Sequence, residues 1–327
     1  MKHIRRTAAR RALPLAVLLP AAALMTAGPC LASESGGGTT PTGATSTGAK
    51  PTVVLVHGYW ADASGWDRIV QALQTQGYPV VATANPLRSL SGDADYLAAQ
   101  LKAIEGPIVL VGHSYGGAVI TNAAAGNPNV ESLVYIAGFA PDRDETAFQL
   151  AAKYPGSRVT DDPNAPVPTA LNAVPLGGDP TNVDLYLKPE KFADVFLSNR
   201  LDASRSQVLA ATQRPATAAS GNEPTQSVAW KTIPSWYLVA TDDRTIGTDN
   251  LRFMAKRAKA TTVEVNAPHA VMETNPDDVT KLILQASGDA RPSLAQTGTN
   301  GRTALLGGAA LLTVAAGTAI VIRARRT

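Results

Sequence analysis

Six short runs of apolar and β-branched residues recur along the middle of the chain. They cover residues 52–57, 80–83, 107–112, 132–138, 236–241 and 262–266. Each run is apolar at consecutive positions rather than at alternate ones, which is typical of strands buried on both faces of a parallel sheet. Between the runs, apolar residues recur at intervals of three and four over residues 66–73, 251–258 and 279–286, which predicts amphipathic helices.

The alternation of strands and helices predicts the fold class. The last helix should begin at Asn275-Pro276, because asparagine is a good cap residue and proline is favoured at the first helical position. Strands that alternate with helices form a parallel sheet with right-handed crossovers. We therefore expect an α/β domain with a doubly wound, mainly parallel sheet of about six strands.

Residues 142–230 interrupt this alternation. Proline, glycine and asparagine are scattered through the segment, with helical patterns around Asp184–Leu197 and Ser204–Thr212. An insertion between two sheet strands emerges at the carboxyl edge of the sheet, where ligands bind in such folds. We expect a helical lid over a site.

One serine lies in a setting that favours nucleophilic catalysis. Gly112-His113-Ser114-Tyr115-Gly116 follows the strand PIVLVG and precedes the alanine-rich segment AVITNAAA. The pattern G-x-S-x-G between a strand and a helix is typical of a nucleophile elbow, in which the flanking glycines let the helix pass close to the strand. The sequence predicts that Ser114 is the nucleophile and that Gly112 and Gly116 form its elbow.

A serine nucleophile needs a base, because its hydroxyl is weakly nucleophilic at neutral pH. After residue 32 the chain has three histidines, and His57 and His113 lie inside loops where they have local structural roles. His269, just after the last predicted strand, is left as the candidate base.

The base needs a carboxylate to orient it. WYLVATDDR places Asp242 and Asp243 at the end of the strand before His269, and we prefer Asp243; Asp242 and Asp142 remain alternatives. An oxyanion hole should combine the backbone N–H of Tyr115 with an amide from the loop after the first strand, for which Tyr59 is the candidate.

The segments HGYWADASGW, VLVGHSYGG, IAGFAPD, SWYLVATDDR and PHAVM together resemble the alpha/beta hydrolase superfamily. They are most similar to the branch that holds small bacterial esterases, plant methyl esterases and hydroxynitrile lyases. The resemblance covers residues 51–288. It implies a triad of Ser114, Asp243 and His269 with amide donors from Tyr59 and Tyr115, and a sheet without the first two strands of larger family members.

We therefore expect a serine hydrolase that acts on small carboxylic esters, with no cofactor and no metal site. A hydroxynitrile lyase is the nearest alternative; that branch has a lysine directly after the catalytic histidine, where this chain has Ala270. A non-catalytic ligand-binding module on the cell surface is a second alternative. Apolar and aromatic residues of the lid and of the loop after the first strand favour an apolar acyl or alcohol group, although they equally suit an ordinary lid core: Leu185, Tyr186, Phe192 and Phe196, with Tyr59 and Trp60.

The formal net charge of +3 conceals an acidic central region. Residues 1–32 and 298–327 hold nine bases and no acid, which leaves 20 bases against 26 acids elsewhere. A basic total usually suggests nucleic-acid binding, but here the bases flank apolar segments at the two ends. We expect no nucleic-acid partner.

The first 50 residues have the composition of a leader and a linker. A basic start, an apolar stretch from Ala12 and small residues near Ser33 predict a secretory signal peptide over residues 1–32. Residues 33–50 are rich in glycine, serine and threonine, which predicts a flexible linker. An uncleaved membrane anchor is the alternative interpretation of the first segment.

The last 39 residues have a three-part pattern. Residues 289–298 form a spacer that ends in Leu-Ala-Gln-Thr-Gly, residues 303–322 are uncharged and mainly apolar, and residues 323–327 are basic. The pentapeptide resembles a sortase signal of the L-A-x-T-G type, which implies cleavage between Thr297 and Gly298 and attachment to peptidoglycan after transient membrane insertion. We expect a secreted protein on the wall of a Gram-positive cell; a membrane-tethered extracellular protein is the alternative.

Overall fold

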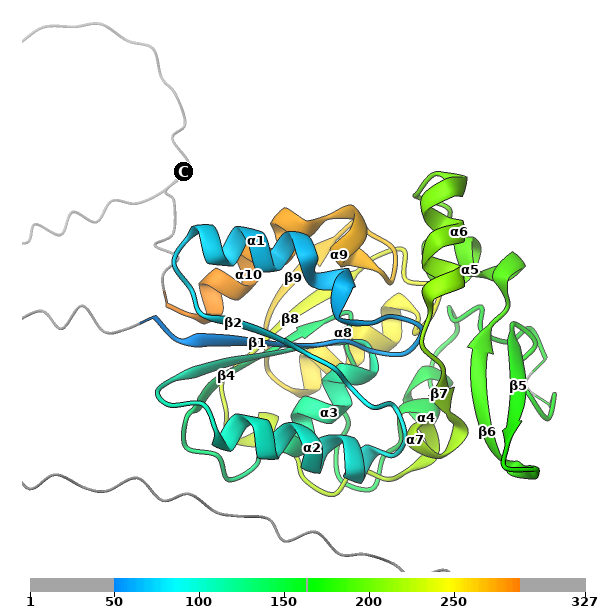
Figure 1. The fold of residues 1–327 in the computed structure, drawn as a ribbon, viewed down its shortest axis with the longest axis horizontal. Coiled ribbons are helices and arrows are strands. Elements are labelled where there is room, and N and C mark those ends of the chain that lie inside the picture. Colours follow the sequence, from blue (N-terminus) through cyan, green and yellow to red (C-terminus); the bar gives the residue numbers. More distant parts are fainter. Residues whose placement is uncertain (1–49, 163, 289–327) are drawn as a thin grey trace, which may run out of the picture. The chain divides into compact units, whose positions relative to one another are not determined.

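The computed structural model describes residues 50–162 and 164–288, which form an α/β domain (Figure 1). All six predicted strands are present. They are β1 (Thr52–Val56), β2 (Val80–Thr83), β3 (Ile108–His113), β4 (Val130–Ile136), β8 (Ser235–Ala240) and β9 (Thr261–Val265). Their order in the sheet is β2-β1-β3-β4-β8-β9, and every neighbouring pair is parallel, which confirms the predicted fold class.

Helices cover both faces of this sheet (Figure 1). α1 (Asp67–Thr75) and α10 (Pro276–Ala286) lie on one face, and α2 (Leu90–Lys102) and α3 (Tyr115–Ala123) lie on the other. α8 (Thr248–Arg257) connects β8 to β9. Strands in the middle of the sheet are therefore buried on both sides, and every residue of β3 is buried. This burial explains their consecutive apolar residues.

α10 begins at Pro276 as predicted, with Asn275 at the cap position. The side chain of Asn275 makes no cap hydrogen bond, however. Its Nδ2 instead donates to the carboxylate of Asp278 at 3.2 Å. The acidic residues Asp277 and Asp278 in the first turn complement the positive end of the helix dipole.

The insertion between β4 and β8 contains more strand than we expected. It holds a three-stranded antiparallel sheet of β5 (Leu171–Leu176), β6 (Asp179–Leu187) and β7 (Ala216–Thr217). Its helices are α4 (Ala147–Ala151), α5 (Pro189–Val195), α6 (Ala203–Thr212) and α7 (Ala218–Asn222), and a 3-10 turn, η2 (Ala229–Lys231), precedes β8. The helix expected over Asp184–Leu197 was wrong in its first four residues, because Asp184–Leu187 pair with β5.

The order of the strands places two loops beside each other at the centre of the sheet. β1 lies between β2 and β3, so the chain leaves β1 in one direction and returns on its other side. Ligands bind at such a switch point, outside the carboxyl ends of the strands. The loop after β1 holds residues 57–62, before the 3-10 turn η1 (Ala63–Trp66), and the turn after β3 holds Ser114.

The predicted signal peptide, linker, sorting signal and apolar segment 303–322 lie outside the described residues, apart from Lys50. Within residues 50–288, no helix is both long enough and apolar enough to cross a membrane.

Candidate active site

Ser114 occupies a sharp turn between β3 and α3. Its φ of 53° and ψ of −126° lie in a region that non-glycine residues seldom adopt. The neighbouring glycines allow this turn, because a Cβ on Gly112 would lie 2.5 Å from the carbonyl oxygen of Gly116. A Cβ on Gly116 would in turn collide with the Val56 carbonyl of β1. The strand, turn and helix therefore have the geometry of a nucleophile elbow.

Ser114 opens onto a large cavity beneath the lid. The cavity volume is about 660 Å³, and Ser114 is 3% exposed. Most of its lining side chains are apolar or aromatic, among them Tyr59, Phe139, Phe148, Tyr154, Val159 and Leu171. The site thus combines one polar nucleophile with walls suited to apolar ligands.

His269 follows β9 and is fully buried. Its Nδ1 lies 2.6 Å from Oδ2 of Asp243, whose side chain is also inaccessible to solvent. With the Nδ1 proton donated to this carboxylate, the neutral ring keeps an unprotonated Nε2 that can accept a proton. Among the described residues, Nε2 of His269 has no hydrogen-bond partner, and none joins it to Ser114.

His113 fixes the backbone of His269 beside the elbow. It directly precedes Ser114, and its Nε2 donates to the carbonyl of His269 at 3.0 Å. The two rings have centroids 4.8 Å apart. Burial, with the nearby His269 as a smaller cause, holds the pKa of His113 well below the usual histidine value. His113 therefore stays neutral and can donate only from the nitrogen that faces His269.

The structure separates the three carboxylates that the sequence left open. Oδ1 of Asp243 accepts the amide hydrogens of Thr245 and Ile246, each at 2.8 Å, so its carboxylate is held toward His269. Asp242 instead pairs with Arg200 and Arg244. Asp142 pairs with Lys231. Only Asp243 of the three contacts His269.

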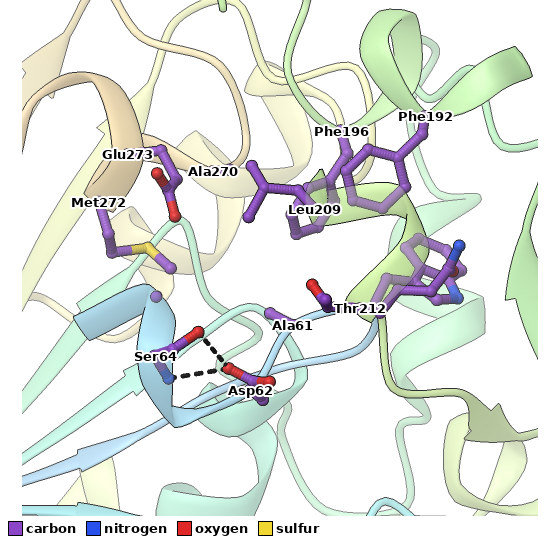
Figure 2. A pocket seen from close by; sticks show the side chains of 13 residues that line it. Ala61, Asp62, Ser64, Phe192, Phe196, Leu209, Thr212, Ala270, Met272 and Glu273 are labelled. Carbon is purple, nitrogen blue, oxygen red and sulfur yellow. Dashed lines mark hydrogen bonds between the residues drawn. The ribbon is translucent and has the colours of Figure 1, made fainter. Parts of the chain in front are cut away.

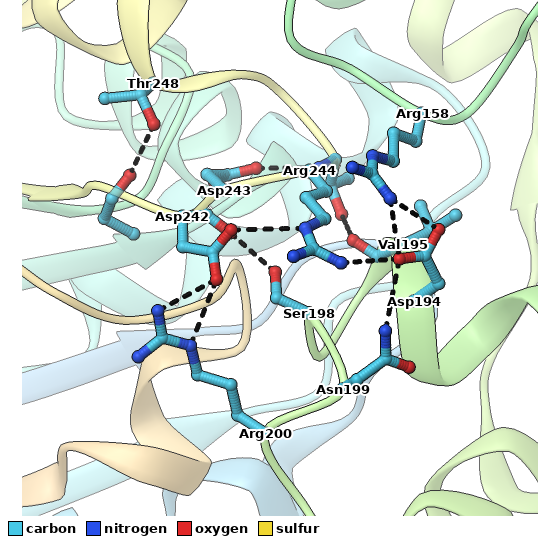
Figure 3. A network of polar contacts seen from close by, with 12 residues as sticks. Arg158, Asp194, Val195, Ser198, Asn199, Arg200, Asp242, Asp243, Arg244 and Thr248 are labelled. Carbon is cyan, nitrogen blue, oxygen red and sulfur yellow. Dashed lines mark hydrogen bonds and ion pairs between the residues drawn. The ribbon is translucent and has the colours of Figure 1, made fainter.

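A chain of ion pairs links the Asp243 loop to the lid (Figure 3). Arg244 donates to Asp194 of α5 at 2.6 Å and contacts Asp242 at 3.2 Å. Asp194 also accepts from Arg158 at 2.9 Å. Single surface ion pairs contribute about 0–1 kcal/mol each, but this shared arrangement orients α5 against the loop that carries the buried carboxylate.

The two amides expected for an oxyanion hole belong to residues beside contacts of Ser114. Tyr115 is the first residue of α3, directly after Ser114, and Gly58 contacts the serine so closely that a Cβ there would lie 2.5 Å from the Ser114 Cβ. Within the described part of the chain, no acceptor pairs with the amide of Tyr59 or that of Tyr115. Both amides are free to bind a developing negative charge.

Sequence reasoning missed the support beneath these amides. The rings of Tyr59 and Tyr115 stack with centroids 4.3 Å apart. The Tyr115 hydroxyl donates to buried Asp93 of α2 at 2.9 Å, and the Tyr59 hydroxyl pairs with Ser220 of α7 at 2.9 Å. Burial raises the pKa of Asp93, against the opposing effect of hydrogen bonds from the Arg88 amide and the Tyr115 hydroxyl. An aspartate in an otherwise ordinary first helical turn was the only signal in the sequence.

His57 has the local role that we expected of it. Its Nε2 accepts the amide hydrogen of Asn85 at 3.0 Å, and the Asn85 side chain donates to the His57 carbonyl at 2.9 Å. Burial lowers the pKa of His57. The ring is therefore neutral and fixes the loop that begins the oxyanion segment.

Comparisons with known proteins identify the family. The sequence profile of the "Alpha/beta hydrolase family" matches residues 53–282. A carbendazim hydrolyzing esterase from Nocardioides sp. (strain SG-4G) is 32% identical over 113 residues, which are 31% of this chain and 47% of that protein. The alpha/beta hydrolase nvfD from Aspergillus novofumigatus (strain IBT 16806) is 28% identical over 264 residues, 74% of this chain and 98% of that protein.

Solved structures share the same fold. The crystal structure of polyneuridine aldehyde esterase superposes with a TM-score of 0.61 at 18% identity, over 73% of this chain and 99% of that chain. The profile match alone covers more than half of the sequence, and the chain therefore belongs to the alpha/beta hydrolase family.

Proposed function

We propose that the protein hydrolyses carboxylic esters through Ser114, His269 and Asp243. The observation that carries this proposal is the buried contact between Asp243 and His269 beside a strained serine that opens onto an apolar cavity. Relatives that bear the names esterase and hydrolase support a hydrolase of the carboxylesterase type.

In this mechanism, Oγ of Ser114 attacks the ester carbonyl carbon while Nε2 of His269 takes the hydroxyl proton. The amides of Tyr59 and Tyr115 stabilise the oxyanion that forms on the carbonyl oxygen. Collapse of this intermediate expels the alcohol, which receives the proton from His269, and leaves an acyl-serine. Water then attacks the acyl carbon, gives a proton to His269, and releases the acid as that proton returns to Ser114.

The test uses the chain from residue 50 to 288 and p-nitrophenyl esters of increasing acyl length. Ser114→Ala, His269→Ala and the double variant should fall to a similar low rate, because members of a triad act as one unit. Ser132→Ala is the matched control, since Ser132 is a buried serine that donates to the Ala286 carbonyl away from the cavity. It should retain activity.

Independent, multiplicative losses in the double variant would contradict a shared role for Ser114 and His269. Cleavage of cyanohydrins by the wild type, without ester hydrolysis, would instead favour the lyase alternative.

We also propose that the protein is secreted and covalently attached to a Gram-positive cell wall. The support is in the sequence: a leader-like start, and the Leu-Ala-Gln-Thr-Gly motif before an apolar segment and a basic end. In a sortase reaction, an enzyme thiol attacks the Thr297 carbonyl and releases the amine of Gly298. A wall-peptide amine then displaces the thiol and forms an amide with Thr297.

Fractionation of cells tests this location. The wild type should be released by wall-degrading enzyme as a detergent-resistant adduct to wall peptide, whereas Thr297→Ala should not form the adduct. A Thr299→Ala control, next to the motif, should behave as the wild type. Recovery of the full-length wild type in the detergent-soluble membrane fraction would support the membrane-tethered alternative instead.

A further inference from the structure

Two cavities meet at Trp60. The large cavity holds Ser114, and a narrow cavity of about 30 Å³ lies between α5, α6, residues 61–65 and α9 (Val271–Thr274) (Figure 2). Trp60 is the one residue that lines both. Trp60 is 6% exposed, and its ring lies 6.2 Å from that of Tyr59, which lines the large cavity, and 6.4 Å from that of Phe196, which lines the narrow one. The indole therefore forms the wall between the two cavities.

The lid holds this indole in place. The backbone amide of Trp60 donates to the Arg214 carbonyl at 3.0 Å, and Nε1 donates to the Leu185 carbonyl of β6 at 3.1 Å. Trp60 has a φ of 57°, which a bulky residue adopts only where its surroundings enforce it. Both acceptors lie in the insertion, so the lid and the loop of residues 57–62 together fix the position of the Trp60 indole.

The side of the narrow cavity next to the indole is apolar. The Trp60 ring packs edge-on against Phe196 with centroids 6.4 Å apart, and Phe196 in turn lies 5.3 Å from the His269 ring. Figure 2 shows Phe196, Phe192 and Leu209 together on the side of α5 and α6. Space behind the indole could therefore accept an apolar group close to the catalytic base.

The acidic lining of the narrow cavity lies on its other side. Glu273 of α9 points into the space in Figure 2 and pairs with Arg205 at 2.8 Å. Asp62 accepts hydrogen bonds from the amide and hydroxyl of Ser64 at 2.8 and 2.6 Å. Both carboxylates have protein partners, so they do not require a ligand.

We propose that Trp60 is a specificity-determining residue that closes the narrow cavity to substrate. The proposal rests on ester hydrolysis at Ser114. A substrate carbonyl at Ser114 then has room for one large apolar group, in the 660 Å³ cavity, while the indole limits the size of the group on the other side of the ester. The matching substrates are uncharged esters with one bulky and one compact part.

A graded series of variants at Trp60 tests the wall. Two ester series are compared, one branched on the alcohol and one on the acyl side, with acid release followed by pH titration. The readout is the ratio of kcat/KM for the branched ester to that for its unbranched homologue. The ratio should rise in whichever series carries its branch on the side of the ester that faces Trp60. In Trp60→Gly the rise should be roughly tenfold or more, because an added methylene in an apolar pocket is worth about that factor. Trp60→Leu should rise less, and Trp60→Phe least.

Refilling the narrow cavity provides the internal control. Trp60→Gly combined with Leu209→Phe should lose most of the gain, because the new ring would occupy the space behind the missing indole. Trp230→Ala is the matched tryptophan control: its indole also donates to a carbonyl, that of Pro141 at 2.8 Å, and it lines neither cavity. Its ratio should stay at the wild-type value.

Thermal unfolding of each variant shows whether it is folded. If Trp60→Gly does not fold, the ratio measured for Trp60→Leu is used instead. An unchanged ratio in both series, or a gain that survives refilling, would overturn the role of Trp60. A wild type that cleaves no ester would overturn the proposed function itself, whereas hydrolysis with an unaltered ratio would overturn only this inference.

Discussion

Asp243 has a different environment from the aspartate next to it. Its carboxylate is enclosed, receives two backbone amides at 2.8 Å on one oxygen and contacts His269 with the other. Asp242 lies among arginines at the surface. The sequence could place both at the end of β8, but the side to which each turns depends on the loop that follows. The conformation of that loop depends on contacts with α5, such as the ion pair of Arg244 with Asp194, which lies 50 residues earlier in the chain.

Replacement of Asp243 by asparagine should leave the fold intact and lower kcat by about 10⁴, because an amide would favour the wrong tautomer of His269. Circular dichroism and ester kinetics check the two parts of this expectation. Asp242→Asn is the matched control and should keep most of the activity, since it weakens partly buried ion pairs with Arg200 and Arg244 but leaves the contact between Asp243 and His269 in place. A crippling effect of Asp142→Asn, with an active Asp243→Asn, would show that the orienting acid lies after β4.

At the scale of elements, the central sheet could be predicted and the lid could not. Strands of a parallel sheet are apolar throughout, and the motif residues follow directly at their ends. β5 and β6 form an antiparallel pair in the insertion, and neither has the continuous apolar sequence of a buried parallel strand. Gly177 and Gly178, both with positive φ, form the two-residue turn between them and were the available signal for a hairpin.

The side chains that support the site could not be predicted from the sequence, for a related reason. Asp93 of α2 lies 22 residues before its partner Tyr115, and Trp60 bonds to Leu185, 125 residues further along the chain. No local periodicity records such pairings. The triad candidates could be named because each sits at a strand end, whereas these partners depend on how the helices and the lid pack.

Across the whole molecule, the domain encloses two neutral histidines at its centre. His57 and His113 are both fully buried, and burial lowers the pKa of each below the usual histidine value of about 6.5. The unfolded chain takes up their protons as the pH falls through about 6.5, whereas the folded chain resists protonation. Acid should therefore favour unfolding, by up to about 1.4 kcal/mol per pH unit for each histidine that remains neutral in the fold.

Urea unfolding between pH 7.5 and pH 5 measures this loss. His113→Gln should be less stable than the wild type at pH 7.5, because the substitution disturbs the contact with the His269 carbonyl. Its stability should nevertheless decline less steeply as the pH falls, since one titrating group is gone. An identical decline in the variant and the wild type would assign the acid sensitivity to other groups, such as His57 or the carboxylates in ion pairs.

Tyr78 joins the two ends of the described domain. Its ring lies 4.1 Å from the Lys50 ammonium, and its hydroxyl pairs with Ser287 at 2.7 Å. Figure 1 shows both ends on the side of the sheet away from β5, β6 and α6. If the domain is attached to a solid support through either end, its lid faces the medium. The cavity beneath the lid then remains accessible to molecules in solution. The two attachment points are equivalent in this respect, so immobilisation could use either one without turning the entrance toward the support.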